Sequence, residues 1–217
     1  MKSYISIPHL LDSSKKKSDL FRTLRVTAFD KLDGSNIRAE FNPKRGFYKF
    51  GSRKVLIDEN SEHLGKAVTL IQDTKAKELG RIFKDLRWDK PVVCFFEYHG
   101  ERSFAGNHHP DDDHQVTLID VSPHKQGLIA PKDFVKHFKE IGIPGIVHQG
   151  LIDDDFIEAV KQSQLEGITL EGVVCKAANP NGKKTSQPIM FKVKTEKWLD
   201  MLREFVDYDE KLFRKLM

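Results

Sequence analysis

The sequence predicts an α+β fold, with mainly antiparallel sheets flanked by helices, in a single domain that spans residues 1–217. Three observations predict it. Hydrophobic residues make up 39% and charged residues 31% of the chain, which is enough apolar material for a core. Segments with the pattern of strands follow one another and are joined by short turns, as in hairpins. The chain also lacks the regular strand–helix alternation of a doubly wound parallel sheet.

Each predicted strand follows from a local pattern of apolar residues. Alternation of apolar and polar residues predicts half-buried strands, the first two of which are joined by a tight turn at Asp33-Gly34. A continuous apolar run, PVVCFFEY, predicts a buried central strand. The last two strands flank the turn sequence NPNGKK. In order, the predicted strands are residues 24–29, 36–41, 46–52, 91–98, 115–121, 168–177 and 188–194.

Helices are predicted where apolar residues recur every three to four positions. This spacing extends over residues 60–87, with two glycines as possible breaks, and returns over residues 131–140 and 153–166. A C-terminal amphipathic helix is predicted from about residue 195. Its apolar side carries Trp198, Leu199, Leu202, Phe205 and Val206.

The bulk properties favour a cytoplasmic protein. Cys94 and Cys175 each lie in an apolar run, so we expect two buried, reduced thiols. The sequence has no run of about 18 apolar residues and no signal-peptide core. The net charge of +4 permits nucleic-acid binding without requiring it. We expect the basic run Lys15–Lys17 and the acidic run Asp111–Asp113 to be solvated loops.

The stretch FDKLDGSN places Lys31 at the end of a predicted strand, two residues before Asp33-Gly34. A lysine amine is nucleophilic only when it is deprotonated, which burial or neighbouring positive charge promotes. The glycine would let a ligand approach the backbone. Taken alone, the pattern also fits an exposed turn lysine.

Two acids and an arginine also lie near the ends of predicted strands. Arg53 lies in GSRK after the third strand, and Glu97 ends the buried strand in CFFEYHG. The segment LEGVVCK contains Glu171 and Lys176. These two are separated by an odd number of residues, so they fall on opposite faces of a strand unless a bulge intervenes.

The segment FKVK places Lys192 and Lys194 two residues apart, on one face of a strand. Their charges repel unless an anion such as a polyphosphate lies between them, and they would lower the pKa of a nearby amine. A lysine nucleophile, a cationic cluster and carboxylates for a divalent metal are what nucleotidyl transfer through a lysine–nucleotide phosphoramidate requires.

Together, KLDGSN, SRK, FFEYHG, LEGVVCK and FKVK resemble motifs I, Ia, III, IV and V of the covalent nucleotidyltransferases. This superfamily includes ATP-dependent DNA ligases, RNA ligases and mRNA capping enzymes. The resemblance covers about residues 24–194 in the right order. The chain is most similar to the T4 RNA ligase 2-like branch, because Asn36 stands where DNA ligases usually carry arginine. The short SRK motif and the spacing from Glu171 to Lys192 agree.

The resemblance implies that Lys31 attacks the α-phosphate of ATP and forms a lysine–AMP intermediate. The AMP then passes to a 5′-phosphate end of RNA, and a 3′-hydroxyl end displaces it. Glu171 would position Mg²⁺ (or Mn²⁺), and Lys192 and Lys194 would stabilise phosphate charge. The remaining residues that would shape the turn or contact the nucleotide or the RNA end are Asp33, Gly34, Asn36, Arg53, Glu97 and Lys176.

The chain departs from this family where an aromatic residue commonly stacks on the adenine. Leu118 and Ile119 occupy that region in the strand VTLIDV. Dispersion contacts could replace part of the stacking. Tyr98 and Phe29 are the candidates to supply the missing ring.

The second departure concerns further domains. DNA ligases and capping enzymes carry an OB domain, and T4 RNA ligase 2-like enzymes carry a helical C-terminal domain. Only 23 residues follow Lys194, so we expect no OB domain. The chain would then be a minimal RNA-repair ligase acting on RNA ends or a nicked duplex, or an adenylating domain that needs a partner protein to recognise ends. We favour the minimal enzyme.

The segment ERSFAGNHHPDDDH leaves three alternatives open. A structural metal could be held by His108, His109, Asp111 and His114, although their spacing lacks a tetrahedral zinc pattern. The segment could face RNA through Arg102 and His108, or it could be a solvated loop.

Two other functions compete with the RNA ligase. A DNA-nick ligase or another polynucleotide adenylyltransferase would use the same chemistry. An inactive nucleotide- or RNA-end-binding module belongs to a different class, and the complete set of charged residues argues against it.

Overall fold

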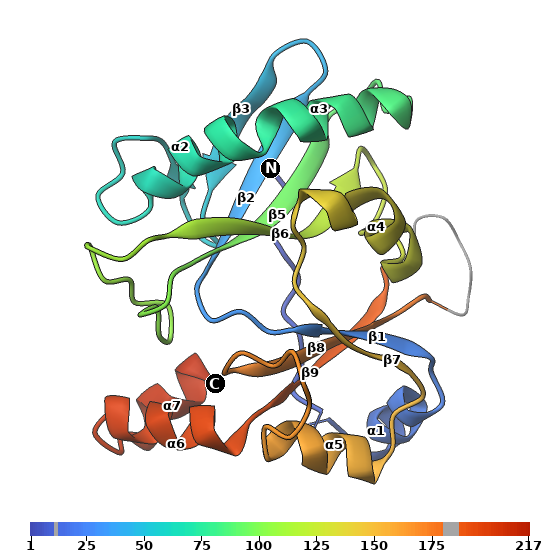
Figure 1. The fold of residues 1–217 in the computed structure, drawn as a ribbon, viewed down its shortest axis with the longest axis vertical. Coiled ribbons are helices and arrows are strands. Elements are labelled where there is room, and N and C mark those ends of the chain that lie inside the picture. Colours follow the sequence, from blue (N-terminus) through green and yellow to red (C-terminus); the bar gives the residue numbers. More distant parts are fainter. Residues whose placement is uncertain (11–12, 180–186) are drawn as a thin grey trace. The chain divides into compact units, whose positions relative to one another are not determined.

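In the computed structural model, which describes residues 1–10, 13–179 and 187–217, the chain forms two antiparallel sheets flanked by helices (Figure 1). This architecture confirms the predicted α+β class. The chain divides into two compact units, each with one sheet. Unit 1 comprises Met1–Ile5, Gly34–Ile143 and Asn179–Pro188, and unit 2 comprises Ser6–Asp33, Pro144–Ala178 and Ile189–Met217.

Unit 1 contains a five-stranded sheet and the helices that pack on it. Its elements are β2 (Ser35–Asn42), β3 (Gly46–Gly51), β4 (Leu56–Ile57), α2 (Gly65–Thr74), α3 (Ala76–Asp85), β5 (Val92–His99), β6 (Gln115–Pro123), α4 (Pro131–Phe138) and the 3₁₀ helix η1 (Lys139–Ile141). The strand order is β4-β3-β2-β5-β6, so β5 is internal, as its apolar sequence predicted. Helices α2 and α3 lie across one face of this sheet (Figure 1), where Phe41 of β2 packs edge-on against Phe83 of α3.

The register of this sheet separates an apolar face from a polar one. Ile37 of β2 pairs with Phe96 of β5 on the face that packs against the helices, and both are fully buried. The neighbouring pair, Asn36 and Glu97, therefore points to the other face. Alternation along β2 and β5 thus places two predicted site residues, Asn36 and Glu97, on the same side of the sheet.

Unit 2 contains a four-stranded sheet. Its elements are α1 (Lys15–Arg22), β1 (Val26–Asp30), β7 (Ile146–Gly150), α5 (Asp154–Lys161), β8 (Gly172–Ala177), β9 (Ile189–Lys194), α6 (Glu196–Phe205) and α7 (Glu210–Leu216). The strand order is β7-β1-β8-β9, and every pair is antiparallel. Phe21 of α1 stacks on Phe191 of β9, and Phe156 and Val160 of α5 belong to the same core.

The opposite face of this sheet is cationic. Val173 and Val193 pair across β8 and β9 on the core side, so the intervening pairs face away from the core. These pairs bring Lys176, Lys192 and Lys194 to one face. The predicted shared face of the two lysines in FKVK is therefore present.

The first two predicted strands exist, but they do not form a hairpin. β1 pairs with β7 and β8 in one sheet, whereas β2 pairs with β3 and β5 in the other. Residues 31–34 link the two sheets. All five residues of β1 are buried, so the prediction of a half-buried strand is wrong here. A local pattern identifies a strand without identifying its partners.

Several local predictions also differ from the structure. Residues Lys15–Lys17 form the first turn of α1, not a loop; this helix has no side-chain N-cap and no acid in its first turn, so it lacked the usual start signals. The sequence did not predict the edge strand β7, because its residues do not alternate between the core and the solvent. Asp112 is buried, although the acidic run was predicted to be solvated. Most of the predicted turn NPNGKK lies outside the described residues.

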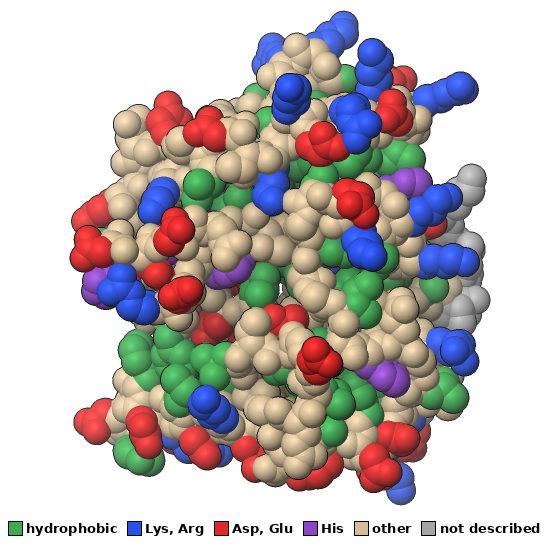
Figure 2. All heavy atoms as spheres, in the orientation of Figure 1, with side chains coloured by type: hydrophobic (Ala, Val, Ile, Leu, Met, Phe, Trp, Pro, Cys, Tyr) green, Lys and Arg blue, Asp and Glu red, His purple; other side chains and the backbone are tan. Residues whose placement is uncertain are grey.

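The C-terminal segment forms two helices. α6 begins after Thr195, whose hydroxyl accepts a hydrogen bond from the backbone N–H of Trp198. Hydrophobic side chains gather over α6 and α7 on the surface seen in Figure 2. The exposed apolar residues of these helices and of the turn between them are Met201, Phe205, Tyr208 and Leu212.

Two bulk predictions can be compared with the structure. Cys94 and Cys175 are buried free thiols, as expected. Over residues 1–10, 13–179 and 187–217, we find no helix with both the length and the apolar character needed to cross a membrane.

Candidate functional site

Lys31 follows β1 directly and is fixed at its backbone by a hydrogen bond from its N–H to the carbonyl oxygen of Gly172 (2.9 Å). Its side chain is only 22% exposed, and its Nζ lies 2.6 Å from Oε2 of Glu171. The sequence placed these two residues 140 positions apart. The lysine is therefore held by a partner and is not a free turn residue.

Glu171 bridges two lysines. Its second carboxylate oxygen, Oε1, lies 2.9 Å from Nζ of Lys194, and both of these side chains are almost completely buried. Gly172 makes this placement possible, since it adopts φ 134° and a Cβ there would lie 2.2 Å from the carbonyl oxygen of Val193. The chain can therefore turn into β8 directly after the acid, beside Lys194.

Burial and charge act against each other in this cluster. Burial alone would raise the pKa of the Glu171 carboxyl, but the ammonium groups of Lys31 and Lys194 outweigh it and lower that pKa below its usual value. For Lys194, burial dominates and lowers the pKa to about 8, although the Glu171 carboxylate favours the charged amine. The cluster thus combines an ionised acid with a lysine that titrates near neutral pH.

Lys176 lies on the same sheet face as Lys192 and Lys194, with its Nζ 4.9 Å from the ring centroid of Phe29. The prediction that it falls on the opposite face from Glu171 is wrong. Glu171 precedes the strand, and the unusual backbone at Gly172 breaks the alternation between the two. Lys192 donates a hydrogen bond to the backbone oxygen of Met217 (2.5 Å), a contact that its motif did not suggest.

A second acid next to the nucleophile candidate was missed by sequence reasoning. Asp30 is buried, and its two carboxylate oxygens accept hydrogen bonds from the backbone N–H and the hydroxyl of Thr169 (3.0 Å each). Burial raises the pKa of Asp30, while the bonds from Thr169 oppose that shift. This pairing fastens the residue before Lys31 to the segment that carries Glu171.

In unit 1, Asn36 and Glu97 face each other across β2 and β5. The side-chain nitrogen of Asn36 donates weakly to the carbonyl oxygen of Phe96 (3.4 Å), whereas its Oδ1 is buried and accepts no hydrogen bond from the described residues. A buried acceptor without a donor is costly in a protein alone and suits contact with a ligand. Arg53 is exposed on the turn after β3.

Gly34 packs closely against β5. A Cβ at this position would lie 2.2 Å from the carbonyl oxygen of Tyr98, so only glycine fits without a backbone shift. Asp33 belongs to unit 2, where its carboxylate accepts a 2.6 Å hydrogen bond from Nε1 of Trp198. The glycine and the acid of the KLDGSN motif are thus both fixed by packing that the motif alone did not reveal.

The histidine-rich segment is an ordered part of unit 1. His108 bridges the hydroxyls of Ser103 and Ser35 (2.9 and 2.8 Å), and burial, followed by the charge of His114, lowers its pKa to about 4. Among the described residues, no group of three or more histidine, cysteine or acidic side chains is arranged to hold a metal ion. The metal-site alternative is therefore not supported, and neither is a fully solvated loop.

Three side chains considered for contact with the adenine, Leu118, Tyr98 and Phe29, are all buried. Leu118 is fully buried in unit 1. Tyr98 is also buried, and its ring lies 4.7 Å from the ring centroids of both His108 and His114. In unit 2, Phe29 lies beneath Lys176 on the cationic face. Of the two candidate rings, Phe29 is the one in unit 2, with its ring centroid 4.9 Å from Nζ of Lys176.

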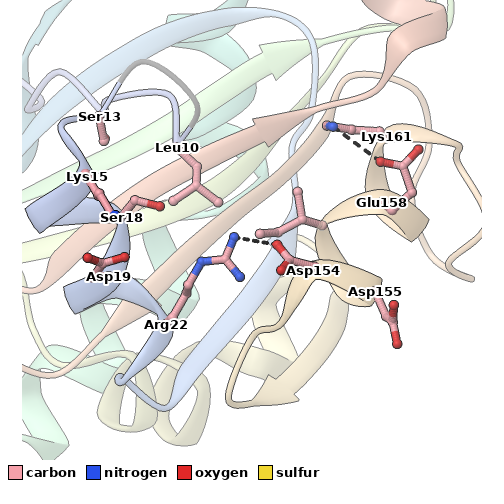
Figure 3. Close-up of a pocket in the computed structure, with 11 residues that line it drawn as sticks. Leu10, Ser13, Lys15, Ser18, Asp19, Arg22, Asp154, Asp155, Glu158 and Lys161 are labelled. Atoms are coloured by element: carbon pink, nitrogen blue, oxygen red, sulfur yellow. Dashed lines mark hydrogen bonds and ion pairs between the residues drawn. The ribbon is translucent and has the colours of Figure 1, made fainter.

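A separate surface cavity of about 860 Å³ lies between α1 and α5 in unit 2 (Figure 3). Four of its charged side chains pair with one another, in the contacts from Arg22 to Asp154 (2.6 Å) and from Lys161 to Glu158 (3.3 Å). None of the predicted site residues lines it. The lysine–carboxylate cluster, not this cavity, is therefore the candidate site.

The donor set around Glu171 limits how a divalent metal could bind. Both oxygens of the carboxylate are paired with lysines, and the part of the chain that the structure describes offers no cluster of three metal-ligating side chains. Mg²⁺ commonly keeps several waters and binds one or two carboxylates together with substrate phosphates. Glu171 fits that mode as a single protein ligand and does not fit a metal cage made of protein groups.

The fold is shared with solved RNA ligases. Residues covering 94% of the chain superpose on Naegleria gruberi RNA ligase solved with pyrophosphate, with a TM-score of 0.68 and 16% sequence identity. An archaeal ATP-dependent RNA ligase superposes over 100% of the chain with a TM-score of 0.65 and 13% identity. No protein-family model and no curated protein sequence matches the chain.

The two matched enzymes are longer than this chain, which covers 58% of the Naegleria enzyme and 56% of the archaeal one. At these identities, the comparisons establish the shared fold. A variant of the Naegleria enzyme was solved with ATP and Mn.

Proposed function

We propose that this chain is an ATP-dependent RNA ligase that joins 5′-phosphate and 3′-hydroxyl RNA ends through a lysine–AMP intermediate. The observation that carries the proposal is the buried bridge from Lys31 through Glu171 to Lys194. This bridge unites the residues of motifs I, IV and V on a fold shared with RNA ligases. The assignment to the T4 RNA ligase 2-like branch and to a single domain over residues 1–217 is part of the same proposal.

In this reaction, Nζ of Lys31 attacks the α-phosphorus of ATP, a P–N bond forms, and pyrophosphate leaves. The ion pair with Glu171 favours the charged amine, so the amine must first lose a proton, either to the Glu171 carboxylate or to water. Lys194 and Lys192 supply positive charge to the phosphates, and Lys176 extends the cationic face. The AMP is then transferred to the 5′-phosphate, and the 3′-hydroxyl displaces it.

Further residues are proposed to contact the nucleotide or the RNA end. Asn36 offers a buried side-chain oxygen that accepts no hydrogen bond from the described part of the chain. Glu97 would accept from the ribose hydroxyls, and Arg53 would meet phosphate or the RNA end. Glu171 would hold Mg²⁺ or Mn²⁺ together with the phosphates, and the metal would supply charge neutralisation there. Asp33 and Gly34 shape the backbone after the nucleophile.

Labelling with α-labelled ATP or GTP and a divalent metal tests the first step. We expect ATP, and not GTP, to label the wild type covalently, and we expect no label on Lys31→Ala. The exposed Lys90→Ala serves as a matched control that keeps the label. Label that survives in Lys31→Ala would refute the assignment of the nucleophile.

Sealing assays then separate the possible acceptors. Nicked duplex RNA, nicked DNA, RNA–DNA hybrids and single-stranded RNA with a 5′-phosphate should be tested in parallel. We expect sealing of RNA ends. Sealing of DNA alone would identify a DNA-nick ligase, and labelling without sealing would indicate an adenylating domain that needs a partner protein.

A further inference from the structure

Trp198 is one of the buried residues of α6. Its side chain is 1% exposed, and its backbone N–H is capped by the hydroxyl of Thr195 at 3.1 Å. α6 begins two residues after Lys194, so the position of the indole is tied to the end of β9. The sequence indicated only an apolar residue of an amphipathic helix here.

Two contacts of the indole lie within unit 2. Its Nε1–H donates a 2.6 Å hydrogen bond to Oδ2 of Asp33. Its ring lies under the ammonium of Lys194, with Nζ 3.4 Å from the ring centroid. Tryptophan is the best aromatic partner for a cation, and the attraction increases when the pair is desolvated, as it is here. Neither contact is needed merely to fill a core.

These contacts close a ring of interactions around the nucleophile candidate. Starting from Lys31, the ring passes through Glu171 and Lys194 to Trp198, and then through Asp33 back along the chain. A closed ring fixes the relative positions of its members better than an open chain of pairwise contacts. Removal of the indole takes away the ring under the Lys194 ammonium, which keeps its ion pair with Glu171, and removes this donor from the Asp33 carboxylate.

We propose that Trp198 is a positioning residue for lysine adenylation. Its hydrogen bond to Asp33 fixes the loop that carries Lys31, and its ring holds the ammonium of Lys194, which meets the phosphates. The proposal rests on the proposed function, since it needs adenylation to occur. It makes α6 part of the active-site scaffold and not a passive C-terminal helix. Misplacement of a reacting group by about 1 Å can cost on the order of a hundredfold in rate.

The test compares Trp198→Phe with Trp198→Leu in the full chain, using single-turnover formation of the labelled lysine adenylate. Phenylalanine keeps a ring under Lys194 and loses the donor to Asp33, whereas leucine loses both. We expect the rate at saturating ATP to fall roughly tenfold for Trp198→Phe and on the order of a hundredfold for Trp198→Leu. The KM for ATP should change by less than about threefold, because positioning affects the chemical step more than binding.

A double-mutant cycle separates positioning from a general loss of structure. Rates are normalised to the folded fraction, measured by circular dichroism at the assay temperature. In an Asp33→Ala background, Trp198→Phe should cause little further loss, because the shared hydrogen bond is already absent. Independent, multiplicative losses would show that Trp198 does not act through Asp33 and would overturn the proposal.

The outcomes also separate this proposal from the proposed function. If the wild type forms the adenylate and both Trp198 variants form it at the wild-type rate, the positioning role is refuted and the ligase assignment stands. If the wild type forms no adenylate under conditions where it is folded, the proposed function fails and the positioning role fails with it.

Discussion

The charge bridge at Glu171 makes a prediction about stability that is independent of any substrate. Replacing Glu171 with glutamine keeps the shape of the side chain and removes the negative charge between two ammonium groups. Lys31 is partly exposed and can turn to water, but Lys194 cannot, since its side chain is 1% exposed. The cost of the substitution is therefore set by what Lys194 does.

The size of the effect follows from proton linkage. In the wild type, Lys194 has a pKa of about 8 and stays charged below that pH. In Glu171→Gln, we expect this amine to be neutral in the folded state, while in the unfolded state it carries its proton. The folded variant then binds one proton fewer than its unfolded state, so its stability falls as pH falls, by about 1.4 kcal/mol per pH unit. Relative to the wild type, the loss should be below about 1 kcal/mol at pH 8 and about 2 to 3 kcal/mol at pH 6.

Urea unfolding, followed by circular dichroism at pH 6, 7 and 8, measures this difference directly. The double variant Glu171→Gln/Lys194→Met is the matched control. It has no buried amine left to titrate, so the pH dependence of the stability loss should disappear. A loss in Glu171→Gln that is the same at pH 6 and pH 8, or a double variant that keeps the pH dependence, would refute the role of Lys194 in this reasoning.

Three further predictions concern other parts of the structure. The pKa of His108 is lowered to about 4, so the folded state binds its proton less readily than the unfolded state, and stability should fall as pH falls from 6.5 to 4. After allowance for solvent screening, we expect His108 to contribute about 1 to 2 kcal/mol to this fall. Thermal unfolding across that range should show this contribution in the wild type and not in His108→Asn. Gly34→Ala places a Cβ 2.2 Å from a carbonyl oxygen of β5 and should destabilise the chain by about 1 to 3 kcal/mol, whereas Gly145→Ala has room and should not; equal melting temperatures would contradict the packing. Thr169→Val removes a hydrogen bond to buried Asp30 and should cost about 1 to 2 kcal/mol in urea unfolding, with Thr169→Ser close to the wild type.

The strands that bear the motifs could be predicted because their signals are local. The apolar run of β5 identifies an internal strand, and the alternation in β2 correctly assigns Asn36 to the polar side of its sheet. The pairing of strands could not be predicted in the same way. β1 and β2 are adjacent in sequence and belong to different sheets, because the short link at residues 31–34 allows a change of sheet as readily as a hairpin.

The candidate site shows the same division between local and distant signals. The motifs named Lys31, Glu171 and Lys194, and the structure brings these three into contact. The contacts that hold them in place join residues 139 positions apart in the Asp30–Thr169 pair and 165 positions apart in the Trp198–Asp33 pair. No spacing rule relates such residues, since only the tertiary fold brings them together. The predicted face of Lys176 relative to Glu171 was wrong because Gly172 adopts φ 134°, which breaks the alternation of side chains between these two residues.

The bridge at Glu171 also has a consequence for how the proposed reaction must begin. A carboxylate 2.6 Å from the Lys31 amine stabilises its charged form, which cannot attack phosphorus. Phosphates that bind at Lys194 would compete with Glu171 for that ammonium, and a metal bound by Glu171 would compete with both lysines for the carboxylate. Metal binding to the carboxylate would weaken the hold of Glu171 on Lys31 and favour loss of the proton from the amine. On this reasoning, ligand binding both supplies the electrophile and frees the nucleophile, so the amine stays protected while the site lacks nucleotide.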